Sequence, residues 1–367
     1  MIKIIQVSTD TNIGGAGKCI ITFLKNFDRS KFDVSVVLPP DSLLKPQVGE
    51  LEIPVYEVGG ISDKSFSLSA VSKLRKLFRE LKPGIVHTHA SMSARIAAKQ
   101  LGIKVVYTRH SVFDPPPLIS KGLGKFINGA VNNYAADTII AVAEAAKDNL
   151  IATGVKADRI KVVLNGVDPL EAAGEEQMEK IREGYGITPE QKVVSIIARL
   201  NEVKGHLDFV DAAKIVLDKG IDVKFIIAGT GDAADKIRER INSLGLREKV
   251  IMAGFVTDVA GLLSITGVQV NCSFGTEATS LSLLEGMSLG IPAVVTDFGG
   301  NRGVIQDGVN GFVVPVKSPE ATAEAIVKLL SDGELYDKMR KNCITIYNEK
   351  FTSRVYTKEL EKIYGDM

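Results

Sequence analysis

Short runs of aliphatic and β-branched residues alternate with longer amphipathic segments along nearly the whole chain. Most of these short runs are continuously apolar and do not alternate with polar residues. Strands that helices cover on both faces have this pattern, which is typical of parallel sheets in α/β proteins. The predicted strands are Ile2–Ser8, Phe32–Leu38, Pro54–Val58, Ile85–Thr88, Lys104–Thr108, Thr138–Val142, Ile160–Leu164, Val193–Ala198, Val223–Ala228, Val250–Met252, Val268–Asn271, Ala293–Thr296 and Gly311–Val314.

The alternation stops once, between residues 168 and 184, where the chain is acidic and rich in turn-forming residues. A chain of 367 residues is also long for a single hydrophobic core. We therefore predict an α/β fold of two doubly wound, Rossmann-like domains that face each other across a central cleft. The predicted domains cover residues 1–170 and 171–350, and a C-terminal helix within residues 351–367 packs back on the first domain.

The composition is that of a globular protein, with 45% hydrophobic and 24% charged residues. A formal net charge of +1 gives no sign of nucleic-acid binding. Cys19, Cys272 and Cys343 lack the spacing of a zinc site, so we expect neither a disulfide framework nor a structural metal. No apolar run reaches the ~18 residues of a membrane span, and the N-terminus lacks the apolar region of a signal peptide. These features favour a cytoplasmic location.

The segment Phe274–Met287 holds two glutamates eight residues apart. Glu277 lies among turn-forming residues, which predicts a loop, and Glu285 lies in a Leu- and Met-rich stretch, which predicts a helix. Eight residues of helix rise roughly 12 Å, comparable with the reach of an extended nucleotide-sugar. Because that separation exceeds the one used by glycosidases, we expect one carboxylate to bind a sugar hydroxyl and the other a ribose.

Glycines follow the first predicted strand and precede a helix. Gly14 and Gly15 allow backbone to approach an anion at the helix N-terminus. The loop is not a Walker A motif, because Asn12 replaces its first glycine and Cys19 its Ser/Thr. A tight turn without a ligand is the alternative.

Three further strand-to-helix loops lie where doubly wound folds bind ligands. Arg199 and Lys204 suit a pyrophosphate, since arginine offers a planar fork and lysine a mobile charge. From spacing alone, however, a pair of solvated surface cations is favoured. The turns Gly229–Gly231 and Phe255–Val256 allow backbone to approach a nucleotide, but taken separately each is more typical of a plain βα turn.

Three of the four histidines lie at predicted strand ends. His110 precedes a long loop, so we expect it to face the cleft and to donate a hydrogen bond to a phosphate or a sugar hydroxyl. His87 and His89 alternate on one strand. They lack a third metal ligand, so we predict a hydrogen-bonded structural role for both.

One segment mixes prolines, apolar residues and lysines, and one helix carries a basic face. The segment covers residues 114–127, including Lys121 and Lys125, and the helix covers Ser69–Leu81. We expect the segment to pack on its own domain and the helix face to be solvated. An anionic membrane surface or a lipid-linked acceptor is the alternative. The cations of the helix are Lys73, Arg75, Lys76 and Arg79.

The order and spacing of these motifs resemble the retaining GT-B glycosyltransferases of family four, or glycosyl transferases group 1. The resemblance covers nearly the whole chain and implies an acceptor-binding first domain and a second domain that binds a nucleotide-sugar. The motifs that carry it are Gly14-Gly15, Asn165-Gly166-Val167-Asp168, Arg199-x4-Lys204-Gly205, Gly229-x-Gly231, Glu277-x7-Glu285, Gly290-x-Pro292, Gly299-Gly300 and Asp307-Gly308-x2-Gly311.

The resemblance implies a role for each candidate residue. Arg199 and Lys204 hold the donor diphosphate and neutralise the leaving group, Glu277 faces the sugar hydroxyls, and His110 lies beside the sugar. Glu285 accepts hydrogen bonds from the ribose, and the base lies between the Gly229–Gly231 turn and the Phe255–Val256 segment. The remaining residues, whose backbone approaches the donor, are Gly14, Gly15, Thr279, Ser280 and Leu281.

The implied reaction retains the anomeric configuration and uses the departing phosphate as base. A covalent sugar adduct on Glu277 is the less favoured alternative. The family needs no metal and no cofactor, because cationic side chains and helix N-termini stabilise the charge. A UDP-sugar is the favoured donor and a GDP-sugar the second. The acceptor is a glycan, a cell-envelope component or a lipid-linked sugar, with weak peripheral contact at the inner membrane face.

Two positions depart from the family pattern. Many members have Glu-Gly-Phe-Gly where this chain has Glu277-Ala-Thr-Ser, so the preference for a donor sugar does not carry over. Many also have a glutamate three residues after the paired glycines, where this chain has Gly303, preceded by Arg302. A local contact is therefore missing or replaced.

Three other functions fit the same architecture. A nucleotide-sugar 2-epimerase shares the two domains but matches the Glu277–Glu285 region less well. A non-catalytic, transferase-like subunit is harder to separate from an active enzyme. A sugar receptor with two domains is disfavoured by the lack of a secretion signal.

Overall fold

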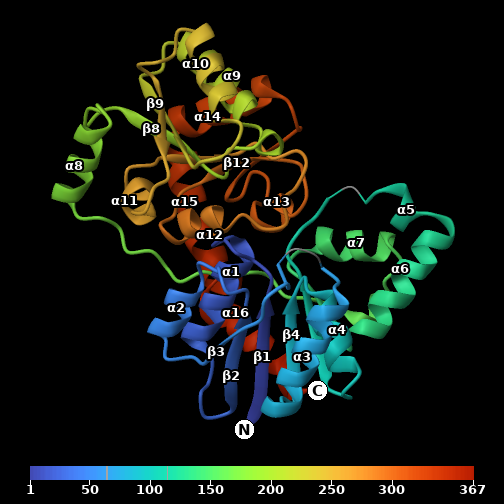
Figure 1. Cartoon of the computed structure of the whole chain (residues 1–367). Coiled ribbons are helices and arrows are strands. Elements are labelled where there is room, and N and C mark those ends of the chain that lie inside the picture. Colours follow the sequence, from blue (N-terminus) through green and yellow to red (C-terminus); the bar gives the residue numbers. More distant parts are fainter. Residues whose placement is uncertain (63–64, 114) are drawn as a thin grey trace. The chain divides into compact units, whose positions relative to one another are not determined.

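The computed structural model describes residues 1–62, 65–113 and 115–367. The chain forms two compact units, each with its own sheet (Figure 1). The first unit comprises Met1–Asp168 together with Lys350–Met367, and the second comprises Pro169–Glu349. Asp114, the first residue of the proline-rich segment, lies outside the described residues.

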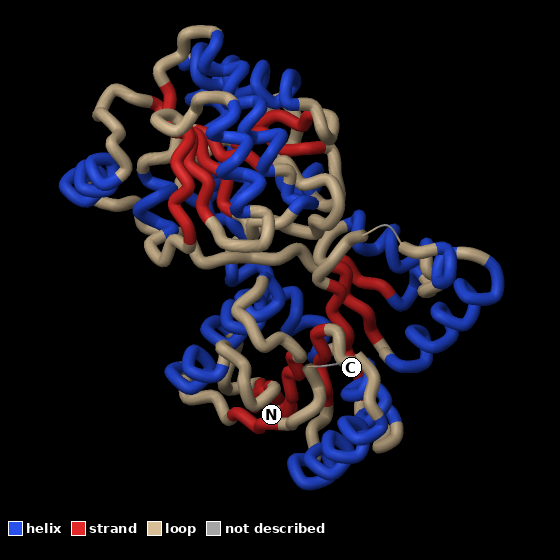
Figure 2. Tube along the Cα trace, turned by 45° about the horizontal axis from the view of Figure 1, so that its top comes forward, coloured by secondary structure: helices blue, strands red, loops and turns tan. Residues whose placement is uncertain are grey.

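The described residues of the first unit form a seven-stranded parallel sheet in the order β3-β2-β1-β4-β5-β6-β7. Helices lie on both faces of this sheet (Figure 2). The strands are β1 (Ile2–Ser8), β2 (Phe32–Leu38), β3 (Val55–Glu57), β4 (Ile85–His89), β5 (Lys104–Arg109), β6 (Thr138–Ala141) and β7 (Ile160–Val162). The helices are α1 (Gly15–Asn26), α2 (Lys45–Glu50), α3 (Leu68–Leu81), α4 (Met92–Lys99), α5 (Pro117–Ser120), α6 (Gly122–Ala135), α7 (Glu144–Ala152) and α16 (Ser353–Gly365).

The second unit, which is described throughout, has a six-stranded parallel sheet in the order β10-β9-β8-β11-β12-β13. Its strands are β8 (Lys192–Ile197), β9 (Val223–Ala228), β10 (Val250–Gly254), β11 (Val268–Asn271), β12 (Ala293–Thr296) and β13 (Gly311–Val314). Its helices are α8 (Glu175–Gly184), α9 (His206–Asp218), α10 (Ala234–Ser243), α11 (Val259–Ser264), α12 (Leu281–Ser288), α13 (Asn301–Val304), α14 (Pro319–Ser331) and α15 (Gly333–Lys350), whose last residue falls in the first unit.

Both sheets confirm the fold class that the apolar runs predict. Each predicted strand is present, with ends that differ by no more than two residues. The strands are buried on both faces because helices cover both, and in the second unit the Phe209 and Phe225 rings meet edge-on at 5.6 Å inside the core. As expected, no strand lies in the turn-rich stretch between residues 168 and 184, all of which the structure describes, and helix α8 lies within it.

The strand order reverses between β1 and β4 in the first sheet and between β8 and β11 in the second. At such a reversal the loops that follow the two strands leave in opposite directions and open a crevice at the carboxyl edge. Ligands of doubly wound folds bind there.

The chain returns to the first unit through a short parallel bridge. Val167 donates its N–H to Phe351 at 3.0 Å and accepts from the N–H of Ser353 at 2.9 Å. Helix α16 begins there and packs on α1 with its buried face, which includes Tyr356 and Tyr364. Among the described residues, no helix is long and apolar enough to cross a membrane.

Candidate functional site

An ion pair occupies the reversal point of the second sheet. Lys204 lies in the loop after β8 and Glu277 in the loop after β11. Lys204 Nζ and Glu277 Oε2 are 2.8 Å apart. The lysine side chain is 18% exposed and the glutamate only 7%. The fold thus brings together two of the predicted catalytic residues, because their strands are neighbours in the sheet.

Two residues that sequence reasoning missed hold the same carboxylate. Asn271 Nδ2 and Ser273 Oγ each donate to Glu277 Oε2 at 3.0 Å. Together with Lys204, three side-chain donors converge on this one oxygen. The available signal was the position of Asn271 and Ser273, which are polar residues at the carboxyl end of an apolar strand.

The two predicted cations differ in what they contact. Lys204 Nζ donates a second hydrogen bond to the Thr276 carbonyl at 2.9 Å, so one of its three N–H groups remains for a ligand. Arg199 is exposed, and its guanidinium has no hydrogen bond or ion pair with any described residue. The site therefore offers one cation that is held by hydrogen bonds and one exposed cation without such bonds to the described residues.

The Gly229–Gly231 turn supports the loop that carries Arg199. A Cβ at Gly229 would lie 2.0 Å from the Ala198 carbonyl oxygen, and a Cβ at Gly231 would lie 2.1 Å from that of Leu200. Leu200 in turn donates its N–H to the Thr230 carbonyl at 2.9 Å. What approaches these glycines most closely is therefore the neighbouring loop, which explains the glycine pair without a ligand.

The paired glycines after β12 support Glu277 in a similar way. Gly299 has a φ of 57°, and a Cβ there would lie 1.9 Å from the Glu277 carbonyl oxygen. Gly300 donates its N–H to that oxygen at 3.1 Å. Next to Gly303, where the sequence departs from the family pattern, Arg302 forms a two-point ion pair with Asp297, at 2.5 and 2.7 Å.

Helix α12 begins only at Leu281, with Ser280 as its N-cap. Glu277 lies in a loop and the partly exposed Glu285 lies in the helix, as predicted. The helical rise of roughly 12 Å between them does not apply, however, because only half of the eight-residue interval is helical. Ser280 Oγ lies 3.0 Å from Ser282 Oγ, so its hydroxyl does not cap the helix.

Of the remaining predicted residues of the second unit, Phe255 and Val256 follow β10, and Thr279 lies in the loop after β11. Phe255 is 75% exposed, and Val256 packs against a small buried cluster that includes Ile226 and Leu262. Thr279 is half-buried next to the N-cap of α12. An exposed phenylalanine on a structured turn offers a flat apolar surface.

Two groups of predicted residues belong to the first unit. Gly14 is the N-cap of α1, and a Cβ at Gly15 would meet no heavy atom within 4 Å. The fold does not itself require glycine at that position. His110 follows β5, and its Nε2 lies 2.7 Å from His89 Nδ1. Both ring nitrogens of His87 and of His89 have partners, which confirms their hydrogen-bonded role.

Family models match the chain over most of its length. Residues 13–170 match the model described as Glycosyltransferase Family 4, and residues 177–345 match Glycosyl transferases group 1. The chain belongs to the GT-B glycosyltransferases of group 1. The resemblance drawn from the motifs is thus confirmed.

Curated relatives of this glycosyltransferase share about a quarter of their residues with it. The N-acetyl-alpha-D-glucosaminyl L-malate synthase of Bacillus anthracis is 26% identical over 88% of this chain and 85% of its own. The UDP-Gal:alpha-D-GlcNAc-diphosphoundecaprenol alpha-1,3-galactosyltransferase of Escherichia coli is 24% identical over 100% of this chain and 97% of its own. The second of these relatives is named as a galactosyltransferase.

Solved structures share the fold of this glycosyltransferase. Anabaena HepE, solved in complex with UDP and glucose, has a TM-score of 0.87 over 100% of both chains at 22% identity. A Rickettsia africae glycosyltransferase has a TM-score of 0.86 at 22% identity, over 100% of this chain and 98% of its own. This likeness confirms the GT-B architecture.

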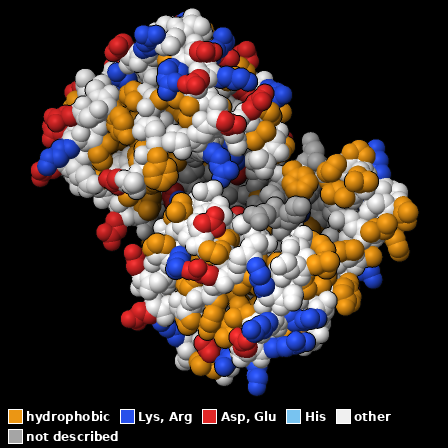
Figure 3. Space-filling view, in the orientation of Figure 1, with side chains coloured by type: hydrophobic (Ala, Val, Ile, Leu, Met, Phe, Trp, Pro, Cys, Tyr) orange, Lys and Arg blue, Asp and Glu red, His pale blue; other side chains and the backbone are white. Residues whose placement is uncertain are grey.

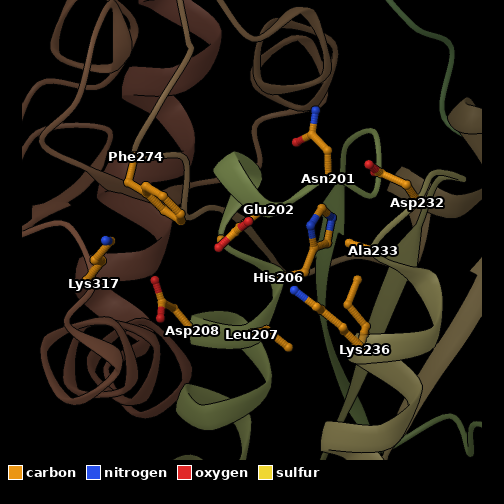
Figure 4. Close-up of a pocket in the computed structure, with 12 residues that line it drawn as sticks. Asn201, Glu202, His206, Leu207, Asp208, Asp232, Ala233, Lys236, Phe274 and Lys317 are labelled. Carbon is orange, nitrogen blue, oxygen red and sulfur yellow. The ribbon is translucent and has the colours of Figure 1, made fainter. Parts of the chain in front are cut away.

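A cavity of about 260 Å³ opens next to the Lys204 loop in the second unit. Figure 4 shows His206 between Asn201 and Lys236, with Phe274 and Lys317 on the other side. Burial lowers the pKa of His206 to about 4. None of the predicted site residues lines this cavity, so it adjoins the ion pair without containing it. Its full lining is Asn201, Glu202, Gly205, His206, Leu207, Asp208, Asp232, Ala233, Lys236, Ile237, Phe274 and Lys317.

The described residues contain no group of three or more His, Cys, Asp or Glu side chains that could hold a metal ion. The three cysteines are free and buried, and burial raises the pKa of Cys19 to about 12. A thiolate at Cys19 is therefore absent at neutral pH.

Proposed function

We propose that this glycosyltransferase moves a sugar from a UDP-sugar to a glycan, cell-envelope or lipid-linked acceptor, with retention of configuration and without a metal or cofactor. The observation that carries the proposal is the buried carboxylate of Glu277, held by the three side-chain donors Lys204, Asn271 and Ser273. The UDP bound by HepE and the UDP-Gal in the name of the Escherichia coli relative support a uridine donor over a guanosine donor.

The two cations act on the diphosphate in different ways. Lys204 is held in place by Glu277 and Thr276, so its remaining N–H points to a fixed position. Arg199 is exposed and can bind two phosphate oxygens with its planar fork. Together they stabilise the charge that develops on the leaving phosphate, which then serves as the base for the acceptor.

Glu277 binds the sugar in this proposal and is not a nucleophile. All three of its side-chain donors bond to Oε2 and none of them to Oε1, so Oε1 is the oxygen that accepts a sugar hydroxyl. A carboxylate that already holds a lysine and two neutral donors has much of its charge neutralised, which makes it a weak nucleophile. Detection of a covalent sugar adduct on Glu277 would reverse this choice.

The other predicted residues bind the rest of the donor. Glu285 accepts hydrogen bonds from the ribose, and the base contacts Phe255 and Val256. In the first unit, the open space next to Gly15 admits a phosphate to the backbone of the α1 N-terminus, and His110 contacts the sugar.

The alternatives are a nucleotide-sugar 2-epimerase and a non-catalytic subunit. The relatives described above do not favour either. A 2-epimerase converts its substrate without an acceptor, so the appearance of an epimeric nucleotide-sugar in a reaction without acceptor would support it.

A panel of nucleotide-sugars tests the donor. We expect the melting temperature to rise with UDP and one UDP-sugar, since a ligand at 100 times its dissociation constant adds about 2.7 kcal/mol of stability. GDP and GDP-mannose should have no effect. Hydrolysis of that UDP-sugar, followed by NMR from the first turnover, should release the sugar with the anomeric configuration of the donor. An inverted first product, or activity that survives Glu277→Ala, contradicts the proposal.

We also propose that α5 and α6 rest on an anionic membrane surface. Exposed apolar side chains gather over these helices (Figure 3), and these side chains do not pack on the unit, whereas α6 itself contacts α4. Leu118 is 79% exposed, Phe126 72% and Tyr134 65%. The other members of this patch are Leu123, Ile127 and Val131, with Lys121 and Lys125 among them. Apolar side chains interspersed with lysines suit the headgroup region of an anionic bilayer.

Co-sedimentation with liposomes tests this surface. We expect binding to anionic but not to neutral liposomes, and loss of binding in Leu123→Ser/Phe126→Ser. Charge reversal of Lys73, Lys76, Lys121 and Lys125 should weaken binding at least tenfold, since each cation near the surface is worth about 1 kcal/mol. Ile344→Ser, which alters an exposed apolar residue on α15, is the control. Equal partition of wild type and both variants contradicts the proposal.

A further inference from the structure

A chain of hydrogen-bonded side chains runs through the interior of the first unit and ends at His110. Its first bond joins His110 Nε2 and His89 Nδ1 at 2.7 Å, and its second joins His89 Nε2 and Gln6 Oε1 at 2.8 Å. His89 ends β4 and Gln6 lies in β1, the two strands between which the order of the first sheet reverses. The chain therefore reaches the edge at which a doubly wound sheet binds ligands.

The series of hydrogen-bonded side chains continues to the C-terminal helix. Gln6 Nε2 donates to the Tyr364 hydroxyl at 2.9 Å, and that hydroxyl lies 2.6 Å from His87 Nδ1. His87 Nε2 then lies 2.6 Å from Thr108 Oγ1. Tyr364 belongs to α16, and its ring packs edge-on against Phe23 at 5.7 Å. Helix α16 thus supplies a polar group to the interior of the unit as well as an apolar face.

Almost all of these hydrogen-bonded side chains are closed to solvent. Gln6, His87, His89 and Tyr364 are buried, and only His110 keeps part of its ring accessible. Burial lowers the pKa of His87 to about 3 and that of His110 to about 4, and it holds the pKa of His89 well below 6.5. Each ring is therefore neutral at pH 7, with one nitrogen that donates and one that accepts.

The amide of Gln6 sets the direction of the bonds toward His110. Because Gln6 Oε1 accepts, His89 carries its proton on Nε2 and accepts with Nδ1. His110 must then donate from Nε2, which leaves its Nδ1 without a proton. The opposite orientation of the amide would reverse both bonds and place the proton of His110 on Nδ1.

Tyr364 joins this amide to His87. Its hydroxyl accepts from Gln6 Nε2 and can donate to His87 Nδ1, whose ring then donates from Nε2 to Thr108 Oγ1. In this arrangement every one of these buried polar groups has a partner, and removal of the Tyr364 hydroxyl would leave Gln6 Nε2 and His87 Nδ1 unpaired.

We propose that Tyr364 and Gln6 are positioning residues that fix the proton of His110 on Nε2 and so present Nδ1 as an acceptor for a hydroxyl group of the donor sugar. The identity of that ligand rests on the proposed function. No described residue is hydrogen-bonded to His110 Nδ1, so this nitrogen is left for the ligand. The role differs from the one predicted from the sequence, in which His110 donates to a phosphate or a hydroxyl.

The position of the proton can be read by long-range ¹H–¹⁵N NMR of the full chain with labelled histidine rings, at pH 7 and without ligand. We expect a single neutral His110 signal with the proton on Nε2, assigned by its loss in His110→Gln. Tyr364→Phe keeps the ring but removes the hydroxyl, and it should populate both proton positions. Phe23→Leu disturbs the packing of Tyr364 but no polar group, and it should leave the signal unchanged.

Two outcomes overturn the proposal. One is a wild-type His110 with its proton on Nδ1 or on both nitrogens, a result that decides the matter even if Tyr364→Phe does not fold. The other is an unchanged His110 signal in a folded Tyr364→Phe variant. Neither result depends on catalysis, so failure of the proposed function and failure of the hydrogen-bonded chain are distinguishable.

Turnover gives a second measurement. We expect Tyr364→Phe to raise the KM for the donor roughly fivefold with less effect on kcat, as for the loss of one neutral hydrogen bond. Donor analogues that each lack one hydroxyl should identify the group that His110 binds, because one of them loses a similar factor in wild type but not in Tyr364→Phe. An equal penalty in both proteins for every analogue contradicts the link between Tyr364 and the sugar.

Discussion

Both sheets reverse their strand order. An ion pair lies at the reversal point of the second sheet, whereas neutral side chains join the strands at that of the first. In the second unit, the loops after β8 and β11 place Lys204 and Glu277 in an ion pair at 2.8 Å. In the first unit, β1 and β4 are joined by neutral side chains, with Gln6 bonded to His89 at 2.8 Å. The same topology therefore supports an ion pair at one reversal point and a series of hydrogen-bonded neutral side chains at the other.

The difference shows what each edge can recognise. A lysine held by a carboxylate keeps its charge and one free N–H, so it can bind a diphosphate without moving. A chain of neutral rings carries no charge to the ligand, but it fixes which nitrogen donates and which accepts. We therefore expect the second unit to bind the charged part of the donor and the first unit to recognise hydroxyl groups.

Removal of Lys204 should have the largest effect on activity. We expect Lys204→Ala to lower kcat for donor turnover by about 100- to 1000-fold, as for other losses of a preorganised group that stabilises the leaving charge. Release of UDP from the donor identified above is the measurement. Lys214→Ala, which removes an exposed cation paired with Asp218 on α9, is the matched control and should retain its activity. An active Lys204→Ala variant would contradict the charged role of the second edge.

Double-mutant cycles compare the coupling energies of the paired side chains at the two reversal points. Lys204→Met or Glu277→Gln alone should each cost about 3 kcal/mol, because each leaves a largely buried partner unpaired. The double variant should cost less than the sum by more than 1 kcal/mol.

The same cycle with His87→Leu and Tyr364→Phe should give a coupling of only about 1 kcal/mol, since no charge is left behind. Chemical denaturation followed by circular dichroism gives these values. A larger coupling energy for His87 and Tyr364 than for Lys204 and Glu277 would contradict the proposed difference between the two units.

The sequence predicts the site residues of the second unit better than those of the first, and the reason is physical. Arg199, Lys204 and Glu277 are charged residues in loops after apolar strands, and charge at such positions is visible in a linear pattern. Gln6 and Tyr364 look like ordinary strand and helix residues, and their bond joins the two ends of the chain, so no local pattern reveals it.

The same limit applies to distances. The loop position of Glu277 and the helical position of Glu285 follow from composition, but the start of α12 at Leu281 depends on tertiary packing. The strand positions are predicted to within two residues because burial on both faces leaves a continuous apolar run.

Substitution of Gly299 tests how the backbone holds the charged edge. Gly299→Ala should cost about 2 kcal/mol or more and lower activity, because its Cβ would clash with the Glu277 carbonyl oxygen and its φ of 57° disfavours alanine. Gly303→Ala adds a Cβ that meets no heavy atom within 4 Å, so it is the matched control. Calorimetric melting temperatures and UDP release are the measurements. Equal effects of the two substitutions would show that Glu277 does not depend on this turn.

The buried histidines of the first unit should make the stability of the protein depend on pH. In the folded protein the pKa of His87 is about 3 and that of His89 is well below 6.5, whereas in the unfolded chain both are near 6.5. Below pH 6.5 the unfolded state therefore binds protons that the folded state does not, and stability falls as the pH falls toward 4. Each such histidine contributes up to about 1.4 kcal/mol per pH unit to this slope. His206 in the second unit shares the shift, so His87→Asn should make the slope shallower by about one proton without abolishing it. Calorimetry between pH 7 and pH 4.5 measures the slope, and an equal slope in wild type and His87→Asn would mean that the ring of His87 is already protonated in the folded protein.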